Sequence, residues 1–293
     1  MASVMNAKTG EEAIVPGVSP QVYSHADFDR IASMVRREAG IVLSDGKKML
    51  AYSRLAPLLR KTGCATFAAF LEEVERDKSL STSMIAALTT NHTYFNREEH
   101  HFSHFAQEVR PDLIERSRSG LAVRLWSAGC SSGEEIWTLM MVLLGEDRAE
   151  GRRIASGNVL ALASDLAEHA VAAGIQGRYD SKAIEAVPQE LRNSWTRPVG
   201  DKTEIAEDLR ALVRFRLLNL LGSWPFANLF DVIFCRNVMI YFDHATKEQL
   251  VWRLVNQLRP GGHLYIGHSE RATGKALDLL ELVGPTIYRR RHG

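Results

Sequence analysis

The chain has 293 residues, of which 45% are hydrophobic and 24% charged, values typical of a globular protein long enough for two domains. The net charge of +1 argues against bulk nucleic-acid binding, and no apolar run approaches the roughly 20 residues that a membrane-spanning helix requires. Residues 1–21 carry acidic side chains and lack the apolar core of a signal peptide, so we expect a poorly ordered arm, no membrane insertion and a cytoplasmic protein.

Only helix signals occur in residues 22–97, which we assign to an N-terminal helical domain and its linker. Ser24 is a plausible N-cap, and apolar residues follow it at helical spacing. Pro57 should kink the second helix or stop it early. Further helices are expected to start at Ser44, at Thr66 and near Ser81. The pattern predicts a small all-α domain.

Strands and helices alternate in residues 98–293, which predicts a doubly wound parallel sheet with helices on both faces. Residues 178–214 break the alternation and predict a small inserted antiparallel β-subdomain. A last strand near 286–290 could close the sheet antiparallel. Strands are expected over 122–127, 159–163, 213–217, 231–235 and 263–266, and helices over 98–118, 134–144, 167–174 and 245–258.

A glycine-bearing loop follows the first of these strands. Gly129 and Gly133 would let the backbone approach a bound ligand closely. Because only two glycines are present and no lysine follows, the loop is neither a dinucleotide fingerprint nor a Walker A loop. The acidic pair Glu134 and Glu135 suits a helix N-terminus by itself, but it would also repel a pyrophosphate and attract an ammonium group. This charge favours a cofactor with an amino-acid tail.

Asp165 ends the second strand of the predicted sheet. A carboxylate in this place typically accepts hydrogen bonds from a ribose diol, although it could instead cap the helix that follows. The glycine loop one strand earlier favours the ribose. An S-adenosylmethionine (AdoMet)-dependent methyltransferase is then the natural class.

Polar residues also follow the buried run Asp231–Cys235, which stops at Arg236 and Asn237 before a short apolar run that carries Tyr241. Open α/β sheets bind their ligands at the carboxyl ends of parallel strands. The three strand ends together indicate a cofactor that contains a nucleoside.

Several sequence blocks, in this order, resemble the CheR-type chemotaxis protein-glutamate O-methyltransferases. The resemblance extends from Ser24 to Tyr288, and its most specific block is Phe234–Phe242. It implies an N-terminal helical domain, an AdoMet-binding α/β domain and an inserted β-subdomain. The blocks are Asn91–Phe102, Trp126–Ala128 with Ser132–Glu135, Ala163–Asp165, Phe234–Phe242 and Gly267–Glu270.

The resemblance also implies which residues bind AdoMet and its product S-adenosylhomocysteine (AdoHcy). Glu135 should take the methionine amino group and Asp165 the ribose, with Asn219 and Leu220 beside the adenine. With Gly129 from the glycine loop, the expected cofactor-binding residues are Asn91, Thr93, Arg97, Gly129, Glu135, Asp165, Asn219, Leu220, Arg236 and Asn237.

The chemistry of glutamate methylation suits this assignment. A glutamate side chain, with a pKa of about 4.3, is already ionised at neutral pH, so its methylation needs no general base. The enzyme has to orient the carboxylate in line with the S–CH₃ bond and to remove its water. Arg97 and Tyr241 are the catalytic candidates, because a guanidinium binds a carboxylate in a bidentate manner and a tyrosine hydroxyl can orient one oxygen.

The expected partners are the cytoplasmic signalling domains of chemoreceptors, which the family methylates. A basic helix with Lys47, Lys48, Arg54 and Arg60 should face their acidic helices. The inserted β-subdomain is a second candidate surface, since it binds a receptor tether in some family members. Here the turn 197–202 is short and lacks the Gly-x-Gly form of those members, which favours recognition without a tether.

No metal is expected. His100 and His104 share a helix face, but no cysteine or carboxylate pair completes a site, and the three scattered cysteines are typical of reduced thiols. Two other functions stay open: an AdoMet-dependent methyltransferase acting on a different protein or a small molecule, and a non-catalytic AdoMet-binding signalling adaptor.

Overall fold

The computed structural model describes residues 14–89 and 91–292, and the chain divides into two compact units, Met1–Thr90 and Asn91–Gly293. Residues 1–13 of the expected N-terminal arm lie outside the described residues. Residues 14–21 form turns, and Val15 is buried, so this part of the arm is structured. The linker 91–97, which the sequence places with the helical domain, belongs to the second unit because its backbone bonds there: the N–H of Asn96 donates to Thr138.

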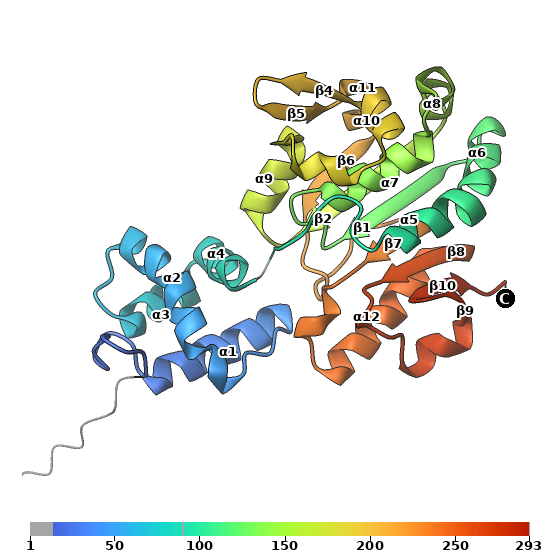
Figure 1. The fold of residues 1–293 in the computed structure, drawn as a ribbon. Coiled ribbons are helices and arrows are strands. Elements are labelled where there is room, and N and C mark those ends of the chain that lie inside the picture. The colour runs from blue at the N-terminus through green and yellow to red at the C-terminus, as the bar shows by residue number, and fades with distance from the viewer. Residues whose placement is uncertain (1–13, 90, 293) are drawn as a thin grey trace, which may run out of the picture. The chain divides into compact units, whose positions relative to one another are not determined.

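The first unit is all helical, as predicted (Figure 1). Ser24 caps α1 and forms a capping box with Asp27. One expectation needs correction: α4 starts earlier than Ser81 because Asp77 accepts from two N–H groups of its first turn. Of the two effects expected of Pro57, the early stop does not occur, since α2 continues to Thr62. The helices are α1 His25–Ala39, α2 Lys48–Thr62, α3 Phe67–Arg76 and α4 Lys78–Leu88, with a 3₁₀ turn η1 Asp45–Lys47.

The second unit contains a seven-stranded sheet in the order β6-β2-β1-β7-β8-β10-β9 (Figure 1). The five strands from β6 to β8 are parallel, and β10 pairs antiparallel with both β8 and β9. The predicted doubly wound fold with an antiparallel closing strand is therefore confirmed. The strands are β1 Val123–Ala128, β2 Val159–Asp165, β6 Val213–Leu217, β7 Phe230–Cys235, β8 Leu258–Ile266, β9 Leu280–Gly284 and β10 Ile287–Arg290.

Two hydrophobic clusters lie on the two faces of this sheet. One contains the apolar residues of α5 to α9, and the other contains those of α12. The helix expected over 98–118 is confirmed as a continuous helical run from 99 to 118, in which a π-helical turn η2 joins α5 to α6 and Pro111 lies in the first turn of α6. The helices are α5 Glu99–His104, η2 Phe105–Val109, α6 Arg110–Arg118, α7 Glu134–Leu144, α8 Arg148–Ala155, α9 Glu168–Gln176 and α12 His244–Gln257, with 3₁₀ turns η4 Met239–Tyr241 and η5 Gly274–Leu279.

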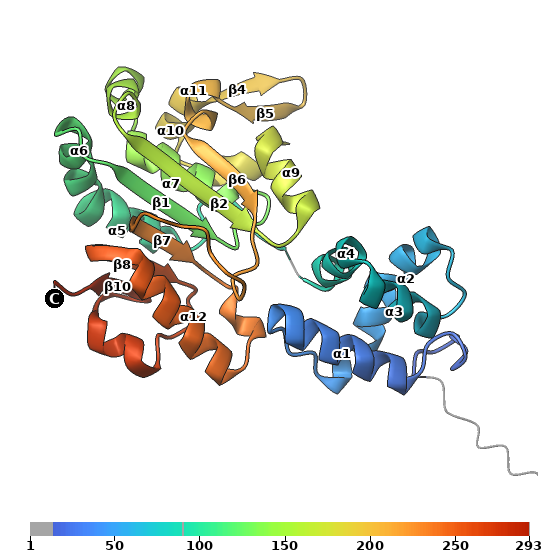
Figure 2. The same cartoon turned by 180° about the vertical axis from the view of Figure 1, so that it is seen from behind.

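The inserted subdomain contains a three-stranded antiparallel sheet in the order β3-β5-β4. Its strands β4 and β5 are labelled above α9 in Figure 2. It lies between α9 and β6 in the chain, in agreement with the predicted insertion. Its elements are β3 Arg178–Asp180, η3 Ala183–Ala186, α10 Gln189–Trp195, β4 Thr196–Val199, β5 Lys202–Ile205 and α11 Glu207–Arg210. None of the helices in the described part of the chain is long and apolar enough to span a membrane.

Candidate active site

The candidate site lies at the carboxyl ends of the parallel strands. β2, β1 and β7 are neighbours, so their last residues Asp165, Ala128 and Cys235 reach the same edge of the sheet. From β1 the chain continues to β2 on one side, while β7 lies on the other. Such a switch point opens a crevice at the edge of an α/β sheet. The residues predicted from separate strand ends are therefore brought together.

The glycine loop after β1 is tightly shaped. Gly129 and Gly133 have φ angles of 84° and 95°, and a Cβ at Gly129 would lie 2.4 Å from Cγ2 of Val238. Ser131 also has a positive φ of 49°, and its N–H donates to Oδ2 of Asp165 at 2.8 Å. The side chain of Asp165 thus fixes the loop.

Asp165 accepts a second backbone hydrogen bond, from the N–H of Ala167 to Oδ1 at 2.9 Å. Burial raises the pKa of this carboxyl group, and the two backbone bonds oppose the shift. Each oxygen keeps a second lone pair for a ligand. The turn-forming contact and the expected ribose contact are therefore compatible.

Three charged side chains, those of Glu98, Glu135 and Arg236, form a buried cluster next to the glycine loop. Glu135 accepts from Ser127 Oγ through Oε1 at 2.6 Å, and its Oε2 lies 3.4 Å from a guanidinium nitrogen of Arg236. Nε of Arg236 lies 3.4 Å from Oε2 of Glu98, and its third nitrogen donates to the carbonyl of Arg97. Arg236 is thus ion-paired with two carboxylates, and it makes one hydrogen bond, to the carbonyl of Arg97.

The cluster has more negative than positive charge, with two carboxylates and one guanidinium. Burial raises the pKa of Glu135, and the Arg236 charge opposes that shift. Burial also acts on Glu98, but Arg236 and the hydrogen bonds from His268 outweigh it and lower the pKa of Glu98 to about 2. A buried excess of negative charge favours a cationic ligand.

Two carboxylates that the sequence did not single out hold the loop after β7. Glu270 accepts four backbone N–H groups, from Asn237, Met239, Ile240 and Gly267, at 2.7 to 3.2 Å. Glu98 accepts from Asn237 Nδ2 at 3.4 Å and from the N–H and ring of His268. Both residues lie in sequence blocks that carry the family resemblance. Those blocks could have indicated that the two residues matter, although the sequence assigned no role to either.

The fixed loop carries two predicted site residues, Asn237 and Tyr241. Asn237 has a φ of 58°, and a Cβ at Gly267 would lie 2.5 Å from its Nδ2. Tyr241 ends the short helix η4 and is half-buried. The backbone before Tyr241 is thus held by Glu270 on one side and packed closely against Gly267 on the other.

The segment before α5 carries three more of the predicted site residues, Asn91, Thr93 and Arg97. Ser131 Oγ donates to the carbonyl of Asn91, which ties this segment to the glycine loop. Arg97 is half-buried, donates to the carbonyl of His92 at 3.1 Å and stacks over the Tyr94 ring at 5.7 Å. Thr93, also half-buried, lies in the same segment.

Asn219 and Leu220 follow β6, the neighbour of β2. Asn219 shapes its own turn by accepting from the N–H of Leu221, and Leu220 is buried. Arg253 of α12 donates to the carbonyls of Leu220 and Gly222 and stacks on Trp224 at 3.9 Å. Arg253 is a further residue that sequence reasoning missed, and no motif marked it.

The residues present fit AdoMet, which carries an ammonium group, a sulfonium and a ribose. Nδ2 of Asn91 is buried and has no hydrogen-bond partner, so it is a donor that a ligand could satisfy. Glu135 belongs to the cluster with excess negative charge, and Asp165 has free lone pairs. Of the two histidines considered for a metal, His104 bonds Tyr265, and His100 is exposed with its ring 4.2 Å from that of His101.

A doubly wound sheet with a glycine loop, a carboxylate at the end of the second strand and buried glutamates beside them is typical of AdoMet-dependent methyltransferases. Residues 91–288 match the family described as "CheR methyltransferase, SAM binding domain", and residues 26–89 match "CheR methyltransferase, all-alpha domain". The chain belongs to the CheR methyltransferase family, and AdoMet is its methyl donor.

Curated relatives match over nearly their whole length. A probable chemotaxis protein methyltransferase of Rhizobium etli is 38% identical over 87% of this chain and 96% of the relative. Chemotaxis protein methyltransferase 2 of Pseudomonas aeruginosa is 37% identical over 91% of this chain and 93% of the relative. The chemotaxis protein methyltransferase of Salmonella typhimurium is 35% identical over 90% of both chains.

Proposed function

We propose that the enzyme transfers a methyl group from AdoMet to glutamate side chains of chemoreceptor signalling domains in the cytoplasm, which yields glutamate methyl esters and AdoHcy. The relatives named as chemotaxis protein methyltransferases support the substrate class. The observation that supports the chemistry is the strand order β2-β1-β7, since Asp165 ends β2, Glu135 follows β1 and Tyr241 follows β7.

The proposed cofactor contacts follow from charge and position. Glu135 binds the methionine ammonium, and Asp165 accepts from the ribose hydroxyls. Gly129 allows close approach of the backbone, while Asn219 and Leu220 flank the adenine. The remaining lining residues are Asn91, Thr93, Arg97, Arg236 and Asn237, of which Arg236 acts by holding Glu135.

When bound, AdoMet supplies an electrophilic methyl group on a sulfonium. Arg97 binds the substrate carboxylate, for which its stacking on Tyr94 and its bond to His92 pre-orient the guanidinium. Tyr241 donates its hydroxyl to one carboxylate oxygen, so the other oxygen is left to attack. The ionised glutamate needs no base, and positioning and desolvation provide the acceleration.

Receptor docking is proposed for the basic surface of α2. Two of its four predicted cations already have other contacts: Arg54 donates to the carbonyls of Leu88 and Thr89, and Lys48 pairs with Asp45. Lys47 and Arg60 are exposed and remain available for acidic receptor helices. The variant K47Q/R60Q should raise the KM for receptor membranes without a change in AdoHcy affinity. An unchanged KM at low salt would exclude this surface.

The test of function is transfer of radiolabelled methyl from AdoMet to receptor-containing membranes, scored as base-labile methanol. Wild type should give base-labile counts, R97A should lose them, and R153A, an exposed arginine on α8, should keep them. Label that never reaches receptors although AdoMet binds would refute the receptor assignment. Base-stable label would mean N-methylation and refute the chemistry.

A further inference from the structure

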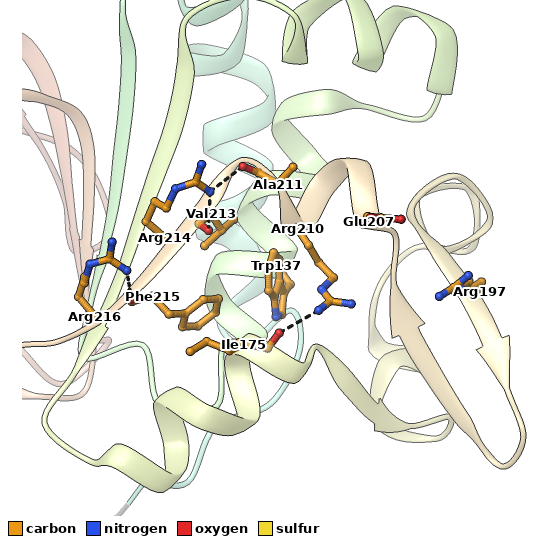
Figure 3. Close-up of a pocket in the computed structure, with 10 residues that line it drawn as sticks. All are labelled: Trp137, Ile175, Arg197, Glu207, Arg210, Ala211, Val213, Arg214, Phe215 and Arg216. Carbon is orange, nitrogen blue, oxygen red and sulfur yellow. Dashed lines mark hydrogen bonds between the residues drawn. The ribbon is translucent and has the colours of Figure 1, made fainter.

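An arginine-lined cavity lies at the open edge of the main sheet, next to the inserted subdomain (Figure 3). Its volume is about 480 Å³, which falls within the range of small-molecule sites. Four arginines from three segments line it, with one glutamate, Glu207. They are Arg197 of β4, Arg210 of α11, and Arg214 and Arg216 of β6.

The arginines nearest the subdomain are held in place by one buried carboxylate. Glu204 is 4% exposed and pairs with Arg178 at 3.2 Å, with Arg197 at 2.6 Å and with Arg210 at 3.2 Å. The hydrogen bond from Arg197 is the largest of the effects that hold the pKa of Glu204 below its usual value. One negative charge thus fixes three positive ones, which leaves a preorganised excess of positive charge.

The two arginines of β6 extend over the free edge of the strand. Arg214 donates to the carbonyls of Ala211 and Val213, and Arg216 donates to the carbonyl of Phe215 (Figure 3). These bonds neutralise no charge. Since they occupy edge carbonyls, they disfavour the addition of a peptide strand at this edge.

In an adjoining cavity, the charges of the arginines are neutralised by a carboxylate. Arg148 and Arg152 both pair with Asp208, at 3.1 and 3.0 Å. Among the described residues, no carboxylate forms an ion pair with Arg214 or Arg216, whose hydrogen bonds go to backbone carbonyls instead. Their charge is therefore available to a ligand.

We infer that this cavity binds a small ligand that carries two or more phosphate groups. Guanidinium forks match phosphate oxygens in pairs, and several arginines around one concave space suit a polyanion. Apolar contact comes from Ile175, Phe215 and Trp137, which line the same cavity and would suit the body of a nucleotide (Figure 3). None of the residues proposed to bind AdoMet lines this cavity, and the buried carboxylates proposed for AdoMet would repel a polyphosphate.

The test is calorimetric titration of the full chain, saturated with AdoHcy, with inorganic pyrophosphate and in parallel with ADP. Pyrophosphate should bind with a dissociation constant of about 0.1 mM or tighter at low salt, and added salt should weaken it. ADP that binds more tightly than pyrophosphate would identify a nucleotide as the ligand. Equal affinities would identify the phosphate groups alone as the recognised feature.

The variant R214Q/R216Q should weaken pyrophosphate binding about tenfold or more, since charge-assisted bonds are lost. The variant R76Q/R118Q removes the same charge from exposed helix positions and should leave the affinity within about twofold. Unchanged AdoHcy binding and unfolding midpoint show that R214Q/R216Q is folded.

Several results would overturn the inference. Pyrophosphate could fail to bind, or both double variants could weaken it equally, which would mean only a general charge effect. AdoHcy could displace pyrophosphate, which would locate it in the cofactor crevice. A glutamate-rich peptide that binds more tightly than either phosphate probe would make the site a protein-docking surface instead.

Discussion

Replacement of Glu270 by Gln should loosen the loop that carries Asn237 and Tyr241. Each oxygen of Glu270 accepts two of the four backbone N–H groups: Oε2 those of Asn237 and Gly267, Oε1 those of Met239 and Ile240. A glutamine keeps one acceptor oxygen and turns an NH₂ group toward the other two donors. Two N–H groups that lose a charged acceptor should together cost about 2–5 kcal/mol of stability.

The assay combines hydrogen exchange with kinetics. Burial raises the pKa of Glu270, so the measurement is made at pH 8 to favour the ionised carboxylate. In E270Q the amides of 236–241 should exchange faster, and kcat for methyl transfer should fall about tenfold or more because a small displacement of Tyr241 misaligns the acceptor. AdoHcy affinity should change less than kcat.

The matched control is E281Q in β9, whose carboxylate is exposed and pairs with Arg289 on the surface. It should leave the exchange of 236–241 and kcat unchanged. The reasoning about Glu270 would be refuted if E270Q kept wild-type exchange over this loop together with wild-type kcat.

Three further predictions concern the cofactor and the response to pH. E135Q should weaken AdoHcy binding about tenfold or more by calorimetry, because the charged partner of the ammonium is lost. R253M should weaken AdoHcy binding with little change in kcat at saturation. The variant loses the hydrogen bonds to the carbonyls of Leu220 and Gly222, which hold the loop proposed to flank the adenine. Burial lowers the pKa of His263 in the folded protein to about 4, below the unfolded value of about 6.5. As the pH falls from 6.5 toward 4, the unfolded chain takes up a proton that the folded protein does not, so the free energy of unfolding falls by about 1.4 kcal/mol per pH unit. H263Q should lack this contribution to the pH dependence of stability, measured by urea unfolding.

Each of these predictions has a contrary outcome. Wild-type AdoHcy affinity in E135Q would remove the ammonium contact from the proposal. A fall in kcat at saturation for R253M, with affinity intact, would mean that the adenine-side loop acts on chemistry instead of binding. Equal acid slopes for H263Q and wild type would show that His263 takes up no proton on unfolding in this range.

Much of the fold could be predicted from local patterns. Helical spacing and the cap at Ser24 predicted α1, and α7 and β6 have the expected bounds. Helix boundaries were predicted less accurately where one side chain determines where a helix begins. Asp77 starts α4 before the apolar residues suggest, and the helix predicted over 98–118 contains a π-helical turn that its sequence pattern did not indicate.

The sequence alone determined which residues reach the site edge, because side chains that follow parallel strands must lie together once the strands pair. It therefore predicted that Glu135, Asp165 and Tyr241 follow strands that prove to be neighbours in the sheet. Only the tertiary structure decided that Arg236 is occupied by two carboxylates and a carbonyl, and that Glu270 holds the loop of Asn237. These contacts join segments some 30 to 140 residues apart, as between Asn237 and Glu270 or Arg97 and Arg236, and depend on the direction of single backbone N–H and C=O groups, which no periodicity of the sequence encodes.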